Sequence, residues 1–93
     1  MQTYVIRRPG IAAGAAELDA ALTRLRAFEE EEMPREVSWL HTYVVVESDG
    51  TLGTVCVYQA ASDQALREHA TRVGVPTDEI LSVVGRVVYR GHP

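Results

Sequence analysis

The feature of this sequence that most constrains its fold is the order in which strand-like and helix-like segments alternate. Four runs are rich in strand-forming residues: 2–7, 37–46, 52–60 and 80–90. Two runs carry apolar residues at helical spacing: 15–33, and a second helix that begins after the capping residue Ser62 and ends at Gly74. The resulting order is strand, helix, strand, strand, helix, strand.

This βαββαβ order is that of the ferredoxin-like fold, an α+β arrangement in which two helices lie on one face of a four-stranded antiparallel sheet. The chain has 93 residues, of which 46% are hydrophobic. That is enough apolar material for one core, but a second domain would have too little chain for its own. We therefore expect a single ferredoxin-like domain over residues 1–93.

Two helices can cover only one face of such a sheet, yet the expected strands are apolar on both sides. In the last run, one side carries Leu81, Val83, Val87 and Tyr89, and the other carries Ile80, Val84 and Val88. An apolar sheet face without helices is a surface for a partner. Because symmetric dimers are the commonest oligomers, we expect a homodimer through the open sheet face.

The hairpin formed by residues 37–46 and 52–60 collects the chemically distinctive side chains. Asp49-Gly50 is a strong signal for a two-residue turn, in which Ser48 would face Thr51. That register predicts three cross-strand pairs: His41 with Tyr58, Tyr43 with Cys56, and Trp39 with Ala60. The five distinctive side chains would then share one face of the sheet, with the Cβ atoms of opposed residues about 4.5–5.5 Å apart. They are Trp39, His41, Tyr43, Cys56 and Tyr58.

A face of this kind permits two interpretations. Small-molecule pockets are mostly apolar with a few polar groups, so Trp39, Tyr43, Cys56 and Tyr58 are candidate ligand-binding residues. Aromatic residues are also enriched where two subunits pack, so the same face could belong to a dimer interface. The pattern of residues is compatible with both.

Two histidines lie within the expected elements, and imidazole is a common ligand of nickel, copper and zinc. His41 lies in the second strand, and His69 lies on the apolar side of the second helix. Both are candidate metal ligands, and the alternative is that they are packed in the core or at an interface. If the helix-covered face is lined by aliphatic residues of the hairpin (Leu40, Val44, Val55 and Val57), His41 points to the open face and the two histidines cannot share one metal ion.

Charge and composition exclude several classes of protein. A net charge of −4 and a pI near 5.2 argue against nucleic-acid binding. No run approaches the roughly 20 apolar residues of a membrane helix, and the N-terminus has neither the charge order nor the apolar length of a secretory signal. Cys56 is the only cysteine, so no intrachain disulfide requires an oxidising compartment. We expect a cytoplasmic protein without membrane or nucleic-acid partners.

Four short blocks resemble a known family: WLHTY at 39–43, CVY at 56–58, LREHA at 66–70 and GVPTDEI at 74–80. They are similar to a family of small bacterial proteins, many of them actinobacterial, whose described relatives are nickel-binding, nickel-responsive homodimers with a ferredoxin-like fold. The resemblance implies that His41 and His69 are nickel ligands. A further histidine of such relatives is Val75 in this chain.

Three functions follow from these observations. The first is a dimeric divalent-metal-binding protein, with nickel implied by the resemblance. It would be non-catalytic, since no nucleophile with its base and no glycine-rich phosphate loop is apparent. The second is a dimeric module that binds a small organic ligand on the aromatic face, with or without catalysis. The third is a dimer with a purely structural role.

Overall fold

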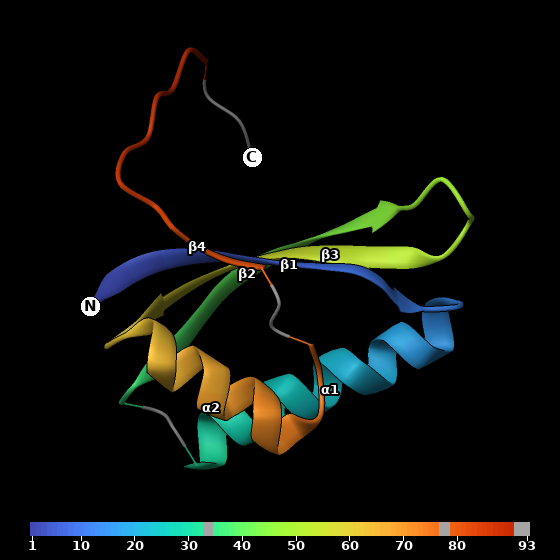
Figure 1. The fold of residues 1–93 in the computed structure, drawn as a ribbon, viewed down its shortest axis with the longest axis horizontal. Helices are drawn as coiled ribbons and strands as arrows, with labels where there is room; N and C mark the ends of the chain where they lie inside the picture. Colours follow the sequence, from blue (N-terminus) through green and yellow to red (C-terminus); the bar gives the residue numbers. More distant parts are fainter. Residues whose placement is uncertain (33–34, 77–78, 91–93) are drawn as a thin grey trace.

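The computed structural model describes residues 1–32, 35–76 and 79–90. Its elements follow in the order β1 (Gln2–Ala12), α1 (Ala15–Glu32), β2 (Val37–Val46), β3 (Leu52–Ala60), α2 (Asp63–Val73) and β4 (Glu79–Ser82). The strands form one antiparallel sheet in the order β2-β3-β1-β4, and both helices lie on the same side of it (Figure 1). The predicted ferredoxin-like α+β architecture is confirmed.

Both helices form where the apolar spacing predicts them and bury the expected side. On α1, Leu18, Ala21 and Leu25 are buried at intervals of three and four residues. Burial of a side chain such as Leu25 stabilises the fold by about 1.5–3 kcal/mol relative to leaving it exposed. Helix α2 is capped by the hydroxyl of Ser62 and ends at Gly74, whose φ is 84°. Neither helix is long and apolar enough, over its described residues, to cross a membrane.

Strand β1 is longer than predicted. A strand was predicted over residues 2–7, but β1 continues through the Pro9-Gly10 pair to Ala12, which pairs with Leu52 of β3. The register between the two strands shifts in this region, where Gly10 has a φ of 60°. Proline and glycine are both tolerated at such irregularities. The pair therefore distorts the strand without ending it.

Strand β4 is shorter than predicted. A strand was expected over residues 80–90, but β4 ends at Ser82. It pairs antiparallel with β1, with Ser82 opposite Tyr4. The Val83 N–H still donates to the Thr3 carbonyl at 2.9 Å, and beyond Val84 a longer β4 would run past the start of β1 at Gln2. Residues 83–90, which we call the C-terminal arm, leave the sheet on the side opposite to the helices (Figure 1).

The β2–β3 hairpin has a three-residue loop, where a two-residue turn was predicted. The Glu47 N–H donates to the Thr51 carbonyl at 2.8 Å, and the Gly50 N–H donates to the Glu47 carbonyl at 3.0 Å. Gly50 has a φ of 86°, as expected for the last residue of a three-residue loop built on a type I turn. Glu47 therefore faces Thr51, and each pair next to the loop is displaced by one position from the predicted register.

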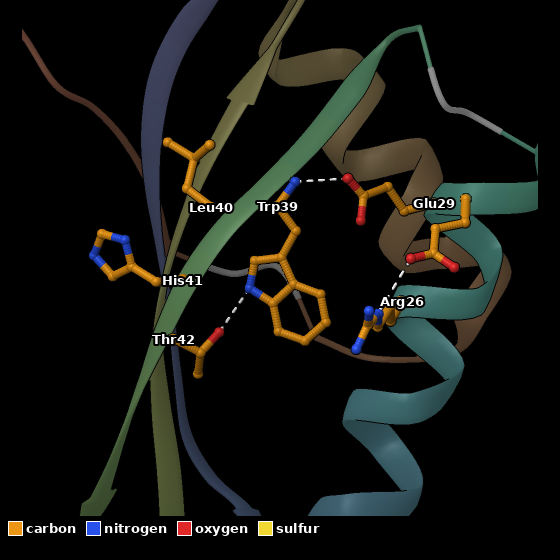
Figure 2. A pocket seen from close by; sticks show the side chains of 7 residues that line it. Arg26, Glu29, Trp39, Leu40, His41 and Thr42 are labelled. Carbon is orange, nitrogen blue, oxygen red and sulfur yellow. Dashed lines mark hydrogen bonds and ion pairs between the residues drawn. The ribbon is translucent and has the colours of Figure 1, made fainter.

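A second irregularity lies in β2 at Leu40. On the loop side of it His41 pairs with Val57, and on the other side Trp39 pairs with Tyr58. Leu40 is thus an extra residue in β2, which is a β-bulge. Figure 2 shows the result: Leu40 and His41 point to one side of β2, and Trp39 points to the other, toward α1.

The loop geometry leads to a first prediction. Gly50→Ala should lower the free energy of unfolding by about 1–2 kcal/mol, because a Cβ atom is unfavourable in the left-handed region. Gly85→Ala is the matched control, since Gly85 has no positive φ and no atom within 4 Å of its added Cβ. Urea unfolding of both variants measures the effect. Equal stability of the two variants would contradict the assigned loop.

Candidate functional site

The sequence-predicted site residues divide between the two faces of the sheet. The predicted pairs, His41 with Tyr58, Tyr43 with Cys56 and Trp39 with Ala60, are wrong, because the three-residue loop and the bulge each displace the register by one residue. Trp39, Cys56 and Tyr58 lie on the face that the helices cover, whereas His41 and Tyr43 lie on the open face. The single wall predicted from the hairpin is therefore not formed within one chain.

On the covered face, aromatic stacking and a chain of hydrogen bonds join the hairpin residues. The Trp39 and Tyr58 rings stack with centroids 5.9 Å apart. The Trp39 indole N–H donates to Thr42 Oγ1 at 2.7 Å, and the Thr42 hydroxyl donates to Cys56 Sγ at 3.2 Å. Both Cys56 and Tyr58 are fully buried. Cys56 is therefore a buried free thiol.

Arg8 lies in the same buried layer, where sequence reasoning did not place it. Only 1% of the surface of Arg8 is exposed to solvent. Its Nε–H donates to the Pro76 carbonyl at 2.8 Å, and its Nη1 donates to Cys56 Sγ at 3.5 Å. The signal was available in the sequence, because Arg8 alternates with Tyr4 and Ile6 along β1 and so shares their face.

Three buried polar atoms of this layer lack a hydrogen-bond partner among the described residues. They are Arg8 Nη2, Thr54 Oγ1 and Tyr58 OH. Burial raises the pKa of Tyr58, and the positive charge of Arg8 offsets only part of that rise. The Tyr58 phenol is therefore protonated at neutral pH and available as a hydrogen-bond donor.

His69 is packed into the core on the same side of the sheet. It is 1% exposed, its Nε2 lies 3.0 Å from the Leu25 carbonyl oxygen, and the Phe28 ring centroid lies 5.4 Å from its own. Burial lowers the pKa of His69, the Leu25 hydrogen bond partly opposes this, and the charge of Arg8 adds to it. The contact between His69 Nε2 and the Leu25 carbonyl joins α2 to α1, so the role of His69 in this structure is structural.

His41 has the opposite environment. It is exposed on the open face, and its ring meets that of Tyr43 edge-on at 5.3 Å. A groove of about 1220 Å³ runs between this face and the C-terminal arm, and His41, Tyr43 and Val57 are among its lining residues. Val57 was expected on the covered face together with Val55, but both point to the open face, since they pair with His41 and Tyr43.

The two candidate metal ligands do not form one site within a chain. His69 is enclosed beneath the helices, and His41 lies on the other side of the sheet. Over residues 1–32, 35–76 and 79–90, no group of three histidine, cysteine, aspartate or glutamate side chains is arranged to hold a metal ion. The possibility that the histidines lie on opposite faces is thus the one that the geometry supports. Of the aliphatic set that suggested it, Val44 lies on the covered face, opposite Thr54, whereas Leu40, Val55 and Val57 face the open side.

A cleft of about 450 Å³ lies between α1 and the bulge of β2 (Figure 2). The Glu29 carboxylate accepts a hydrogen bond from the Trp39 backbone N–H at 2.6 Å, which holds the helix to the bulge. Arg26 pairs with Glu30 at its rim, 3.2 Å apart. Trp39 is the one member of the predicted ligand pocket among the residues that line this cleft.

Comparison with known proteins places the chain in context. A family model described as nickel-responsive protein SCO4226-like matches residues 4–83. A crystal structure of SCO4226 from Streptomyces coelicolor A3(2) has a TM-score of 0.72 to this structure at 21% sequence identity, over 91% of this chain and 99% of that chain. At that identity the similarity shows a common fold. No curated protein matches.

The environment of His69 predicts a pH dependence of stability. Because its pKa in the folded state lies below the value of about 6.5 of a free imidazole, the unfolded chain binds the proton more readily. The contribution of neutral His69 is complete above about pH 6.5 and is lost as the pH falls below it. His69→Gln should remove this part of the pH dependence in urea unfolding between about pH 7.5 and 5. His41→Gln, the exposed counterpart, should retain it, and equal profiles for wild type and His69→Gln would contradict the assignment.

Proposed function

We propose, since this chain belongs to the family of SCO4226-like nickel-responsive proteins, that it is a homodimer that binds nickel, or another divalent transition metal, between two open sheet faces through His41. One observation carries the proposal. His41 is the exposed histidine among the described residues, and it lies on an apolar sheet face that no helix covers. His69, the other predicted ligand, has no part in it.

The open face supports association because its apolar side chains are exposed to water. Leu40, Tyr43 and Leu81 are each about half exposed. The C-terminal arm adds Val84, Val87, Val88 and Tyr89, which are also exposed. Together these residues form a far more apolar surface than the scattered side chains usual on a monomer, and such surfaces mark interaction sites.

A second copy of the chain is the occupant that fits this surface best. The arm has a strand-forming sequence, but beyond Val84 it has no residue of β1 left to pair with, because β1 begins at Gln2. The outer edge of β2 in each copy is unpaired, since β2 is the first strand of the sheet. An unpaired edge is a template for a further strand. Two copies related by a twofold axis could therefore each cover the open face of the other with their arms.

Association also supplies what one chain lacks for metal binding. A single exposed imidazole is a weak site, whereas a twofold axis near His41 would bring two imidazoles to one ion, with water completing the shell. Nickel, copper and zinc all suit imidazole nitrogen. The family description favours nickel among them. The proposal therefore places one metal ion in each dimer.

The dimer is tested by light scattering at micromolar concentration. The wild-type protein should have about twice the chain mass of 10.2 kDa. Tyr43→Glu places a charge in the middle of the open face and should give a monomer, because a buried unpaired charge is costly. Thr71→Glu changes an exposed residue of α2 in the same way and should leave the dimer intact. A monomeric wild-type protein would refute this interface.

Metal binding is tested by nickel titration calorimetry on protein without a histidine tag. We expect one nickel ion per two chains, and an affinity that falls as the pH is lowered, because imidazole must be neutral to bind a metal. His41→Ala should weaken binding by at least about tenfold. His69→Gln should leave it unchanged.

Two results would contradict the metal proposal. No heat beyond that of a buffer blank would show that the protein does not bind nickel. Equal loss of binding in His41→Ala and His69→Gln would show that the site is not the one on the open face. The dimer measurement is independent of both, so the interface and the metal site can fail separately.

A further inference from the structure

The outer edge of β2 is an unprotected strand edge. Among the described residues β2 pairs on one side only, with β3. Proteins usually protect such an edge with charged residues or proline, but the β2 sequence VSWLHTYVVV contains neither. Because the Glu47 N–H donates toward β3, alternation along the strand directs the N–H groups of Thr42, Val44 and Val46 to the outer edge. These donors are placed to pair with a further strand.

The C-terminal arm has the sequence pattern of such a strand. Residues 86–90 belong to no strand of their own chain, and all of them are exposed. In an extended conformation Arg86, Val88 and Arg90 lie on one side, and Val87 and Tyr89 lie on the other. One side of the segment is therefore basic and the other is apolar.

The charges beside the outer edge of β2 are opposite to those of the arm. Glu29 and Glu30 line the cleft between α1 and the bulge. Arg26 pairs with Glu30, whereas Glu29 takes part in none of the four ion pairs found among the described residues, and neither do Arg86 and Arg90. Arginine and a carboxylate form strong, often bidentate hydrogen bonds. The arm and the cleft are thus complementary in charge.

We propose that, in the homodimer on whose proposal this inference rests, residues 86–90 of each copy add antiparallel to the outer edge of β2 in the other copy. The Arg90 guanidinium then lies at the cleft and pairs with the Glu29 carboxylate. Val87 and Tyr89 extend the apolar open face. Each copy therefore supplies a fifth strand and a cation to the other.

The dimensions of packed sheets bring the arm to this edge. A row of paired residues crosses all four strands from Trp39 in β2 to Ser82 in β4, and at about 4.7–4.9 Å between strands it is roughly 14 Å long. Where two sheets pack at right angles about a twofold axis near His41, this row of one copy runs along β2 of the other for about four residues. Its Ser82 then lies over β2 near Val45.

The arm is long enough for the remaining distance. It leaves the sheet on the side away from the helices, which is the side of the proposed partner (Figure 1). Residues 83–85, when extended, span about 10 Å, which equals the usual distance between packed sheets. Residues 86–90 then run back along β2 from Val45 toward His41, antiparallel to β2, and end at the cleft.

A double-mutant cycle on the dimer dissociation constant tests the charge pair. Arg90→Gln and Glu29→Gln each remove one charge, and glutamine at position 29 still accepts the Trp39 N–H. Each variant should raise the constant at least about tenfold, because a twofold dimer loses the pair at two places. The double variant should be weakened by much less than the product of the two effects, since the pair is already lost. Arg24→Gln, an exposed arginine of α1 outside the four ion pairs, is the control and should not change the constant. Sedimentation equilibrium measures all four.

Amide hydrogen exchange, followed by NMR, tests the added strand itself. The N–H groups of Thr42, Val44 and Val46 should be protected in the wild-type dimer. The double variant Val87→Pro, Val88→Pro has no N–H at either position and cannot complete a ladder, so these amides should exchange at least about tenfold faster in it. Circular dichroism verifies that each variant is folded, and Arg90→Gln decides the charge test if Glu29→Gln is not.

Three results would overturn the arm exchange, and they separate it from the dimer. A monomeric wild-type protein refutes both. A wild-type dimer whose Thr42, Val44 and Val46 amides exchange as fast as those of the double proline variant refutes the added strand and leaves the dimer standing. A dimer of Arg90→Gln that is as stable as that of Arg24→Gln refutes the pairing of the arm with the cleft.

Discussion

The placement of the candidate functional side chains on the two faces of the sheet depends on the register of the β2–β3 hairpin. The three-residue loop after Glu47 fixes which residues of β2 and β3 face each other near the loop, and the bulge at Leu40 changes the pairing once more. A shift of one residue moves a side chain to the other face of a sheet. The loop puts His41 opposite Val57, on the open face, and the bulge returns Trp39 to the face of Tyr58. The separation of the two histidines, the aromatic stack and the cleft beside α1 all follow from these two local features.

The covered face shows how a small core can hold polar groups. Residues such as Ile6, Leu25 and Leu66 supply the apolar burial. Arg8, Thr54 and His69 are buried among them. Of these three, His69 is the one that leaves no buried side-chain atom without a hydrogen-bond partner among the described residues. Removing one partner from a buried polar group costs more than the pair contributes. The buried atoms of Arg8 and Thr54 that lack a partner are therefore more costly to the fold than the hydrogen-bonded histidine beside them.

The sequence was sufficient for the fold because the helical spacing, the Ser62 and Gly74 caps and the strand-forming runs all indicate the same order of elements. The bounds of β2 and β3 were predicted as observed. Register was not predictable in the same way: Asp49-Gly50 is compatible with loops of two and three residues, and nothing in WLHTY marks Leu40 as an extra residue. The length of β4 is limited by its pairing with β1, in which only Gln2 and Thr3 lie beyond Tyr4, and not by the strand-forming residues of 83–90. Arg8 was missed although its alternation with Tyr4 and Ile6 placed it inward.

The division of the two faces has a thermodynamic consequence for the proposed function. Because His69 is enclosed, metal binding through His41 at a twofold axis requires two chains, so binding and association are linked. A ligand that binds the dimer and not the monomer stabilises the dimer by mass action. By the same linkage, dimerisation raises the affinity for the metal by an equal factor. On this proposal nickel concentration would control the fraction of chains whose open faces and C-terminal arms are covered, which would give the protein a way to respond to the metal.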